Sequence, residues 1–252
     1  MDNENEQSGT SGDGRGDETI IPATPSDDDY VREADAQSDI EASEGGEAFA
    51  VDDDQGEVFT EEDPIQLFRN WLALAGRHEV NDPNAMALAT VDRAGMPNVR
   101  MVLLKDVGTR GFTFYSSAES VKGLELEGTP KAALCFHWKS IRRQVRVRGT
   151  VEALSAEESD EYFASRSRGS QLGAVASFQS RVLDERETLE RRIEDYDAIY
   201  KNRDIPRPDN WHGFLIQPVE IEFWVNRPYR LHDRKQFTLG KGGGWKSVNL
   251  YP

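Results

Sequence analysis

The run RRQVRVRGTVEAL, residues 142–154, alternates polar and apolar side chains in the way that is typical of a half-buried β-strand. Because successive strand residues face opposite ways, its first two valines would point to one face and Gln144, Arg146 and Arg148 to the other. The run before it, KAALCFHW at residues 131–138, is also rich in the residue types that strands favour. The two runs predict neighbouring strands of one sheet.

Similar runs on both sides extend this pattern along the chain. Further strands are predicted at residues 85–92, 98–107, 111–117, 211–225, 229–239 and 244–252. Helices are predicted at residues 63–80, 120–128, 155–171 and 184–202. Antiparallel strands joined by short turns, with the helices grouped in blocks, favour a mainly β fold with flanking helices, built as a small barrel.

The first predicted helix has a clear start signal. Asp63 can cap it, and Pro64 suits its first position because the N–H that proline lacks would be unsatisfied there. An apolar stripe at helical spacing follows, formed by Ile65, Phe68, Trp71, Leu72 and Ala75. We therefore assign residues 63–252 to one folded domain.

Residues 1–62 differ in composition from the rest of the chain. The whole chain carries a net charge of −16, but residues 1–63 alone carry −20, from 22 Asp and Glu against two Arg, so the remainder carries +4. A segment so rich in charge, Gly and Ser and so poor in aromatic residues is typical of disorder. We expect a disordered acidic tail and a mildly basic domain, which suits a small anionic ligand better than nucleic acid.

The sequence also bears on compartment and on metals. It contains no run of about 18 apolar residues, so no membrane span is expected. The tail has no apolar signal segment and is too acidic for a transit peptide. The single Cys135 cannot form an internal disulfide, which favours a reducing cytoplasm. The four histidines are scattered, with no metal-ligand spacing, so no metal site is expected.

Two groups of basic residues lie on single predicted elements. Arg100 and Lys105 flank four apolar residues, so each end of a buried strand would present a charge. Tyr162, Arg166 and Ser170 fall at i, i+4 and i+8, which is one face of a helix. A guanidinium with two hydroxyls suits a phosphate, since arginine binds two phosphate oxygens at once. Taken singly, solvated strand ends and a solvated helix face explain the same patterns.

Two more groups lie on predicted strands. In RPYRLHDR, residues 227–234, alternation would put Arg230, His232 and Arg234 on one face, where these cations would repel one another unless an anion lies there. An amide such as Gln144 both donates and accepts, which suits a heterocycle with a carbonyl next to a ring nitrogen. A polar outer strand face is the simpler explanation for that residue. Several such groups in one domain indicate a flat, phosphorylated ligand.

Six segments together carry a family resemblance. They are NVRMVLLK (98–105), FTFYSSAESVK (112–122), RRQVRVRG (142–149), YFASRSRGSQLGAVASFQS (162–180), EFWVNRPYRLHDR (222–234) and the closing LYP (250–252). In their order and spacing the chain resembles the pyridoxamine 5′-phosphate oxidase family from about residue 63 to residue 252. The resemblance implies an FMN-binding split β-barrel that forms a homodimer, with FMN in clefts between the subunits. It further implies oxidation of pyridoxamine or pyridoxine 5′-phosphate to pyridoxal 5′-phosphate, with O2 as acceptor and H2O2 as product.

The resemblance also assigns site residues. FMN contacts would fall on Arg100, Met101, Val102, Leu103, Leu104, Lys105, Tyr115, Ser116, Lys122, Gln144, Gln179, Ser180, Trp224 and Arg234. Substrate contacts would fall on Lys105, Tyr162, Arg166, Ser170, Arg230, Leu231 and His232. Lys105, Tyr162, Arg166 and Ser170 would hold the substrate phosphate. Arg230 and His232 would be the catalytic residues over the substrate ring, and assistance of proton removal by His232 is a hypothesis.

The chain departs from the family pattern at several positions. Val121 stands where many relatives have a second basic residue beside Lys122, so one contact to the FMN phosphate is expected to be missing. Val225 and Asn226 replace a usual Gln-Gly, Asn249 stands where an Arg is common, and the acidic tail has no clear Arg-x-x-Tyr motif. Losing one charged hydrogen bond costs about 1.5–3 kcal/mol, so FMN is expected to bind, but about ten- to hundred-fold more weakly.

Two other functions stay open at this point. One is a diverged split-barrel flavin reductase or dehydrogenase that does not produce pyridoxal phosphate, against which the retained substrate residues argue. The other is a non-catalytic protein that stores or delivers pyridoxal phosphate or flavin. Turnover of pyridoxine 5′-phosphate under air would distinguish the oxidase from this carrier.

Overall fold

The computed structural model of the chain describes residues 56–252. The predicted disordered tail lies outside the described residues, apart from its last seven. Within those seven, Val58 belongs to the hydrophobic core, and its carbonyl accepts a hydrogen bond from the Trp71 indole at 3.2 Å. The Phe59 ring stacks on the same indole with centroids 6.1 Å apart. The packed part of the chain therefore begins before residue 63, where the sequence analysis put its start.

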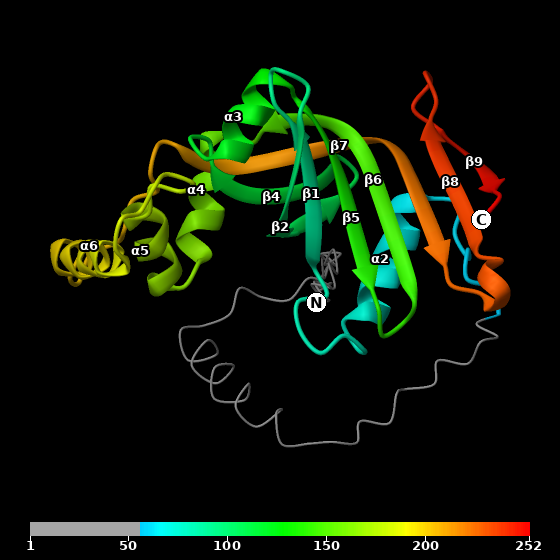
Figure 1. Cartoon of the computed structure of the whole chain (residues 1–252), viewed down its shortest axis with the longest axis horizontal. Helices are drawn as coiled ribbons and strands as arrows, with labels where there is room; N and C mark the ends of the chain where they lie inside the picture. Colours follow the sequence, from blue (N-terminus) through cyan, green and yellow to red (C-terminus); the bar gives the residue numbers. More distant parts are fainter. Residues whose placement is uncertain (1–55) are drawn as a thin grey trace, which may run out of the picture.

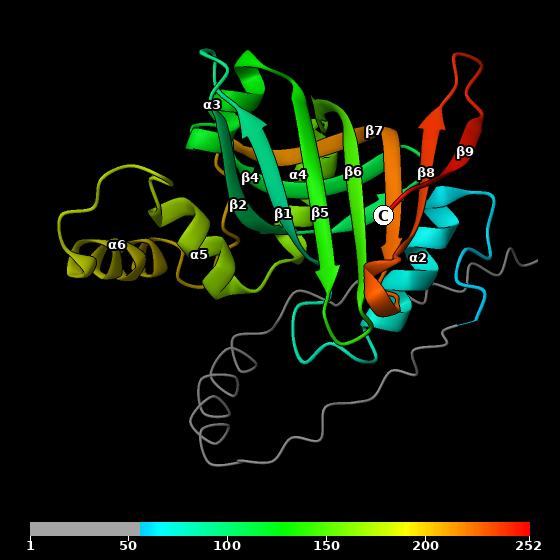
Figure 2. The same ribbon diagram turned by 45° about the vertical axis from the view of Figure 1, so that its right-hand side comes forward.

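The described residues form one antiparallel sheet of nine strands that curls into a half-barrel (Figures 1 and 2). The strands are β1 (Ala85–Val91), β2 (Pro97–Leu103), β3 (Asp106–Gly108), β4 (Gly111–Ser117), β5 (Lys131–Trp138), β6 (Arg143–Ala153), β7 (Trp211–Val225), β8 (Asp233–Leu239) and β9 (Trp245–Leu250). The order is β2-β1-β5-β6-β7-β4-β3, with β8 pairing β7 and β9 pairing β8. Only two residues separate β2 from β3 in the chain, so the two ends of this order have to curve back toward each other. The predicted mainly β fold is confirmed.

The first helix, α2 (Pro64–Ala75), packs on the concave side of this sheet and completes the main core (Figure 2). Asp63 caps it as predicted, since its carboxylate accepts a hydrogen bond from the Ile65 N–H at 2.9 Å. Phe68 lies within 4.9 Å of the rings of Phe112 and Phe136, measured between centroids. The burial of this stripe is what holds the helix against the strands.

Four further helices flank the sheet. They are α3 (Val121–Gly128), α4 (Ala156–Ser165), α5 (Arg168–Ala176) and α6 (Arg186–Ile199). The last three gather beside the end of the sheet at which β7 begins (Figure 1). Phe163, Leu172, Ile205 and Trp211 form a second, smaller core there. This core joins the helices to the first residue of β7 and thereby fixes the position of the residues between α4 and α5.

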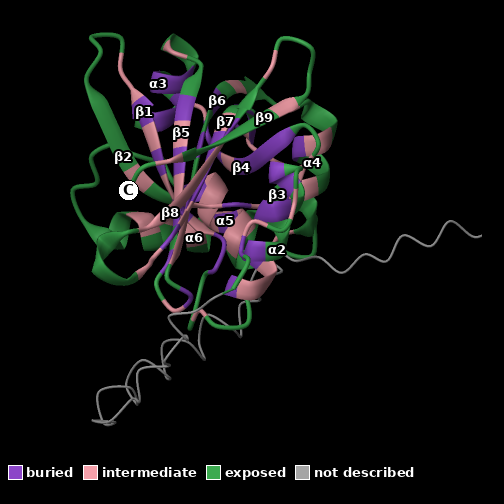
Figure 3. Cartoon of the chain, turned by 90° about the vertical axis from the view of Figure 1, so that its right-hand side faces the viewer, coloured by how far each residue is buried: buried purple, intermediate pink, exposed green. Residues whose placement is uncertain are grey.

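The alternation predicted for residues 142–154 is confirmed in β6. Val145 and Val147 are fully buried, whereas Arg146 and Arg148 are exposed. Buried residues lie along the strands of the sheet and on α2 (Figure 3). The prediction that Arg100 sits in a buried strand is wrong, because β2 is an edge strand of the described sheet and leaves Met101 64% exposed.

Three predicted elements differ from the structure. Residues 98–107 do not form one strand, because β2 ends at Leu103 and β3 begins at Asp106 at the other end of the sheet order. Residues 155–171 do not form one helix, because Ser167 caps a new helix by accepting a hydrogen bond from the Ser170 N–H. Arg166 lies in the extended connection between α4 and α5, at ψ 152°. Residues 229–232 do not form a strand either, since Pro228 opens a short 3-10 turn and Arg230 adopts a left-handed φ of 63°. The strand begins only at Asp233, so the alternation argument for residues 230–234 does not hold.

Candidate active site

Aromatic rings gather at the start of β7. The rings of Tyr115 on β4 and Tyr162 on α4 stack with centroids 3.8 Å apart, and Tyr115 also stacks on Trp211 at 5.3 Å. The Arg166 guanidinium carbon lies 4.9 Å from the Trp211 ring centroid. A flat cation stacked on a tryptophan is favourable and oriented. Tyr162 and Arg166 therefore come together as the sequence predicted, although they do not share one helix.

Lys105 belongs to the same neighbourhood. It lines a pocket of about 340 Å³ together with Tyr115 and Tyr162. Burial lowers the pKa of the Lys105 ammonium, the Arg166 guanidinium lowers it further, and Asp82 partly offsets the effect. Two cations this close repel each other, and an anion bound beside them would relieve the repulsion. The fourth residue predicted to hold the substrate phosphate, Ser170, shares a hydrogen bond of 2.9 Å with the Ser167 hydroxyl.

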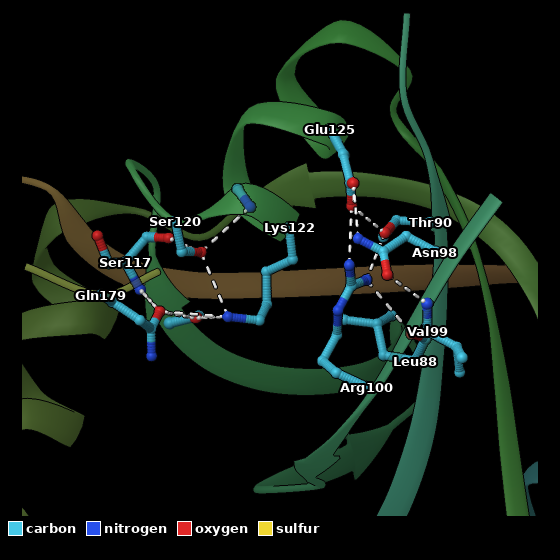
Figure 4. A network of polar contacts seen from close by, with 12 residues as sticks. Leu88, Thr90, Asn98, Val99, Arg100, Ser117, Ser120, Lys122, Glu125 and Gln179 are labelled. Atoms are coloured by element: carbon cyan, nitrogen blue, oxygen red, sulfur yellow. Dashed lines mark hydrogen bonds and ion pairs between the residues drawn. The ribbon is translucent and has the colours of Figure 1, made fainter. Parts of the chain in front are cut away.

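Lys122 lies in a polar cluster at the start of α3 (Figure 4). The Lys122 ammonium is buried and donates to the Ser116 and Ser120 hydroxyls at 3.2 and 3.3 Å and to the Gln179 carbonyl at 3.2 Å. The Ser116 hydroxyl donates to the same Gln179 oxygen at 2.9 Å. Burial lowers the pKa of Lys122, the charge of Arg100 lowers it further, and the Glu125 carboxylate partly offsets the effect. Three residues assigned to FMN by resemblance thus contact one another directly.

Arg100 is held by an acidic network that the sequence analysis missed. Its Nη2 atom lies 2.9 Å from the Glu125 carboxylate, and its Nη1 atom donates to the Thr90 hydroxyl and to the Leu88 carbonyl (Figure 4). Glu125 lies 25 residues away on α3, and nothing in the sequence spacing links the two residues. Only the position of α3 beside β1 and β2 brings them together.

We call these residues together the phosphate half-site. It comprises Arg100, Lys105, Tyr115, Ser116, Lys122, Tyr162, Arg166 and Gln179. Tyr115 and Ser116 are consecutive on β4, and Tyr115 stacks on Tyr162 while Ser116 contacts Lys122, so the two groups of side chains meet at one strand segment. The arrangement brings four cationic side chains close to this strand segment.

A different group of predicted residues gathers at the far end of β7. Strand pairing places Gln144 of β6 opposite Trp224, and Trp224 opposite Arg234 of β8. The His232 ring lies 4.5 Å from the Trp224 ring, and its Nδ1 accepts a hydrogen bond from the Arg227 N–H at 3.2 Å. We call Gln144, Trp224, His232 and Arg234 the ring half-site.

Two charged residues, Arg230 and Glu222, contact or influence residues of the ring half-site. Burial lowers the pKa of His232, and the neighbouring Arg230 guanidinium lowers it further, so its imidazole is neutral at physiological pH. Arg234 donates to the buried Glu222 carboxylate at 2.9 Å and to the Tyr251 carbonyl at 2.8 Å. Glu222 also binds Arg146. This carboxylate is a second acidic residue that the sequence analysis missed.

The two half-sites are anchored at opposite ends of β7. Trp211 and Trp224 mark the two ends of β7 and lie thirteen residues apart. At about 3.3 Å per residue this is roughly 43 Å along the strand. The structure places α4 and α5 at one end of β7 and β8 at the other (Figure 1). The ring half-site and the phosphate half-site therefore lie toward opposite ends of β7 in the described chain.

The remaining predicted residues lie around these groups. Met101 and Leu231 are exposed, Val102 and Leu103 are half-buried, Leu104 is fully buried, and Ser180 has a left-handed φ of 70° just after α5. No group of three or more potential metal ligands occurs among residues 56–252. Within the same range no helix has the length and apolar character needed to cross a membrane.

Comparisons with known proteins identify the family of the chain. Residues 75–200 match the family model described as pyridoxamine 5′-phosphate oxidase, and residues 211–252 match the one described as the pyridoxine 5′-phosphate oxidase C-terminal dimerisation region. A pyridoxine/pyridoxamine 5′-phosphate oxidase of Caulobacter vibrioides is 50% identical over 236 residues, which cover 94% of this chain and 99% of the relative. One of Agrobacterium fabrum is 58% identical over 196 residues, covering 77% and 95%.

Solved structures give the same fold. PhzG from Burkholderia lata, in complex with tetrahydrophenazine-1-carboxylic acid, matches with a TM-score of 0.72 and 30% identity over 82% of this chain and 98% of that chain. An FMN-binding protein of Nostoc punctiforme, related to pyridoxamine 5′-phosphate oxidase, matches with a TM-score of 0.60 and 18% identity over 73% of this chain and 97% of that chain. The second likeness supports the fold alone.

Proposed function

The chain belongs to the pyridoxamine 5′-phosphate oxidase family, and we propose that it oxidises pyridoxamine and pyridoxine 5′-phosphate to pyridoxal 5′-phosphate. In this proposal FMN is the cofactor, O2 is the final electron acceptor and H2O2 is released. Relatives that bear the oxidase name share 50–58% of their residues with this chain. That likeness exceeds the 30% shared with PhzG, so the vitamin B6 reaction is favoured over chemistry on a phenazine.

One observation carries the proposal: the phosphate half-site holds two separate pairs of partly buried cations. The first pair is Arg100 and Lys122, and the second is Lys105 and Arg166. In each pair, burial and the partner's charge lower the pKa of the lysine. Such pairs are stabilised by bound anions. Two anion sites side by side suit a cofactor phosphate and a substrate phosphate.

The residues present fit FMN. Lys122 and Arg100 would hold its phosphate, with the Ser116 hydroxyl and the Gln179 amide completing the contacts. Gln144 and Trp224 from the ring half-site would border the planar ring system. When bound, FMN supplies an electron-accepting ring that no protein side chain can replace.

The residues around the second cation pair fit the substrate. Lys105, Tyr162 and Arg166, with Ser170, would bind its phosphate through charge-assisted hydrogen bonds. Stacking of Arg166 on Trp211 fixes the direction in which the guanidinium presents its N–H groups. His232 and Arg230 would orient the substrate ring from the other half-site. Because Nδ1 accepts from the Arg227 N–H, a neutral His232 carries its proton on Nε2 and would offer the substrate an N–H donor. Assistance of proton removal by His232 would require the contact with Arg227 to break.

We further propose a homodimer in which each site combines the phosphate half-site of one chain with the ring half-site of its partner. The separation of the two half-sites along β7 supports this arrangement, as does the match of residues 211–252 to a dimerisation region. We place the enzyme in the cytoplasm, because Cys135 is its single cysteine.

Anaerobic mixing tests the proposal. Protein loaded with FMN is mixed with pyridoxamine 5′-phosphate in the absence of O2, and the visible flavin absorbance is followed. We expect the absorbance to bleach, and admission of air to restore it while pyridoxal 5′-phosphate and H2O2 form. Binding of FMN and substrate without bleaching would instead support a carrier. A protein that does not bind FMN at all would refute the proposed function.

A further inference from the structure

Glu125 is a buried carboxylate that lies next to the phosphate half-site but is not part of it. It sits on α3, three residues after Lys122, and only 8% of its surface is exposed. One carboxylate oxygen accepts from the Thr90 hydroxyl at 2.5 Å and from Arg100 at 2.9 Å. The other accepts from the Asn98 amide at 3.0 Å. Each partner lies on β1 or β2, so Glu125 joins α3 to two strands.

This carboxylate is charged at neutral pH. Burial by itself raises the pKa of Glu125, but the hydrogen bonds from Thr90, Asn98 and Arg100 outweigh burial and hold it below the ordinary value. A charged, fully hydrogen-bonded carboxylate holds a guanidinium far more firmly than a neutral acceptor does.

The contacts of Arg100 leave one edge of its guanidinium open. Nη1 is used by the Leu88 carbonyl and the Thr90 hydroxyl, and Nη2 by Glu125. Within residues 56–252, Nε makes no hydrogen bond, so Nε and one N–H of Nη2 stay available as a fork. Figure 4 shows Thr90 and Lys122 on opposite sides of the guanidinium. A planar fork of two N–H groups matches two oxygens of a phosphate.

We propose that Glu125 is a positioning residue for the FMN phosphate: it fixes Arg100 so that the open edge of the guanidinium faces the anion site shared with Lys122. The inference rests on the proposed function, because it takes FMN as the ligand. Val121 adds to its weight. Because residue 121 is not a cation in this chain, the FMN phosphate would depend on Lys122 and Arg100. The orientation of Arg100 then matters more than it would beside a second cation at position 121.

The test separates positioning from folding by comparing FMN with riboflavin, which has the same ring system but no phosphate. Dissociation constants for both are measured by titration of the full-length protein, following the quenching of flavin fluorescence. For Glu125→Ala, we expect FMN to bind at least about tenfold more weakly, the size of one misplaced charged hydrogen bond. Riboflavin should bind as it does to the unsubstituted protein, so the dissociation constant of FMN divided by that of riboflavin should rise about tenfold.

Four further variants sharpen the result. Glu125→Gln keeps one acceptor oxygen and should retain more FMN affinity than Glu125→Ala. If Glu125→Ala does not fold, Glu125→Gln takes its place in the test. The matched control is Glu127→Gln, because Glu127 is an exposed acid on the same helix paired only loosely with Arg93 at 4.0 Å. Its constants should not change. Glu125→Ala combined with Arg100→Ala should bind FMN no more weakly than Arg100→Ala alone, because Glu125 acts through Arg100.

An unchanged ratio of FMN to riboflavin affinity in both Glu125 variants would overturn the inference, as would fully additive effects of the Arg100 and Glu125 substitutions. Loss of both ligands in parallel would also overturn it, because that result indicates a structural role alone. Failure of the unsubstituted protein to bind FMN is a different outcome, since it refutes the proposed function itself.

Discussion

Replacing Arg166 by lysine tests how the substrate phosphate is recognised. Lysine keeps the positive charge but loses the planar fork that binds two oxygens together. It also loses the stacking that orients the guanidinium 4.9 Å above Trp211 and 5.8 Å from Phe163, measured to the ring centroids. The substitution therefore removes the oriented, two-oxygen contact and keeps the positive charge.

The size of the effect follows from one lost contact. A charge-assisted hydrogen bond contributes about 1.5–3 kcal/mol, and about 1.4 kcal/mol corresponds to a factor of ten in affinity. We expect the KM for pyridoxamine 5′-phosphate to rise about 10- to 150-fold in Arg166→Lys. The kcat should change little, because the phosphate contact is made equally in the ground state and in the transition state.

Initial rates of pyridoxal 5′-phosphate formation, measured under air with protein saturated in FMN, give both constants. Arg168→Lys is the matched control, since Arg168 lies two residues away and binds Asp197 at 2.7 Å on the surface. Its KM should stay within about twofold of the original. A KM for Arg166→Lys that matches this control would show that Arg166 does not bind the substrate phosphate.

Three further predictions concern charge and the start of the fold. The pKa of Lys105 is lowered from 10.5, and the side chain is charged only below that lowered value, so substrate affinity should fall as the pH rises through it. The alkaline limb of the pH profile of kcat/KM measures this fall, and the profile of Lys105→Met should lack it. Val121→Lys adds a cation beside the FMN phosphate site and should tighten FMN binding about tenfold, in a fluorescence titration at low salt; unchanged affinity would mean that this position does not face the phosphate. Removing residues 1–55 should leave turnover and Tm nearly intact. Removing residues 1–60 also deletes Val58 from the core, which should lower the free energy of unfolding by about 1.5–3 kcal/mol for that side chain. Equal melting curves for the two truncated proteins would contradict the packing of Val58.

Much of the fold could be predicted because local signals and the final structure agree. The alternation in β6 follows directly from which residues face the core, with Val145 and Val147 fully buried. Asp63 and Pro64 mark the start of α2 through backbone hydrogen bonding, which depends on near neighbours alone. Signals that act over a few residues can be interpreted without knowing the rest of the chain.

Two local errors came from periodicity that continued past a break. Tyr162 and Arg166 keep helical spacing, yet Ser167 offers its hydroxyl as a new cap and divides the segment into two helices. Alternation in residues 229–232 likewise suggested a strand, although Pro228 and the left-handed Arg230 turn the chain there. A cap or a proline outweighs a weak periodic pattern.

Glu125 and Glu222 could not be predicted because their partners come from distant parts of the sequence. Glu125 meets Arg100 only when α3 lies beside β1 and β2, and Glu222 meets Arg146 only through the register of β6 against β7. In the sequence, each looks like an ordinary surface acid. The charge of such residues becomes informative only after the fold has placed them.

The length of β7 has a consequence for inheritance. If each active site contains residues from both subunits, catalytic activity depends on the dimer and not on either chain alone. A variant lacking Arg166 and another lacking His232 could assemble into mixed pairs, in which one centre collects both defects and the other collects none. Two individually inactive alleles would then restore part of the activity when expressed together.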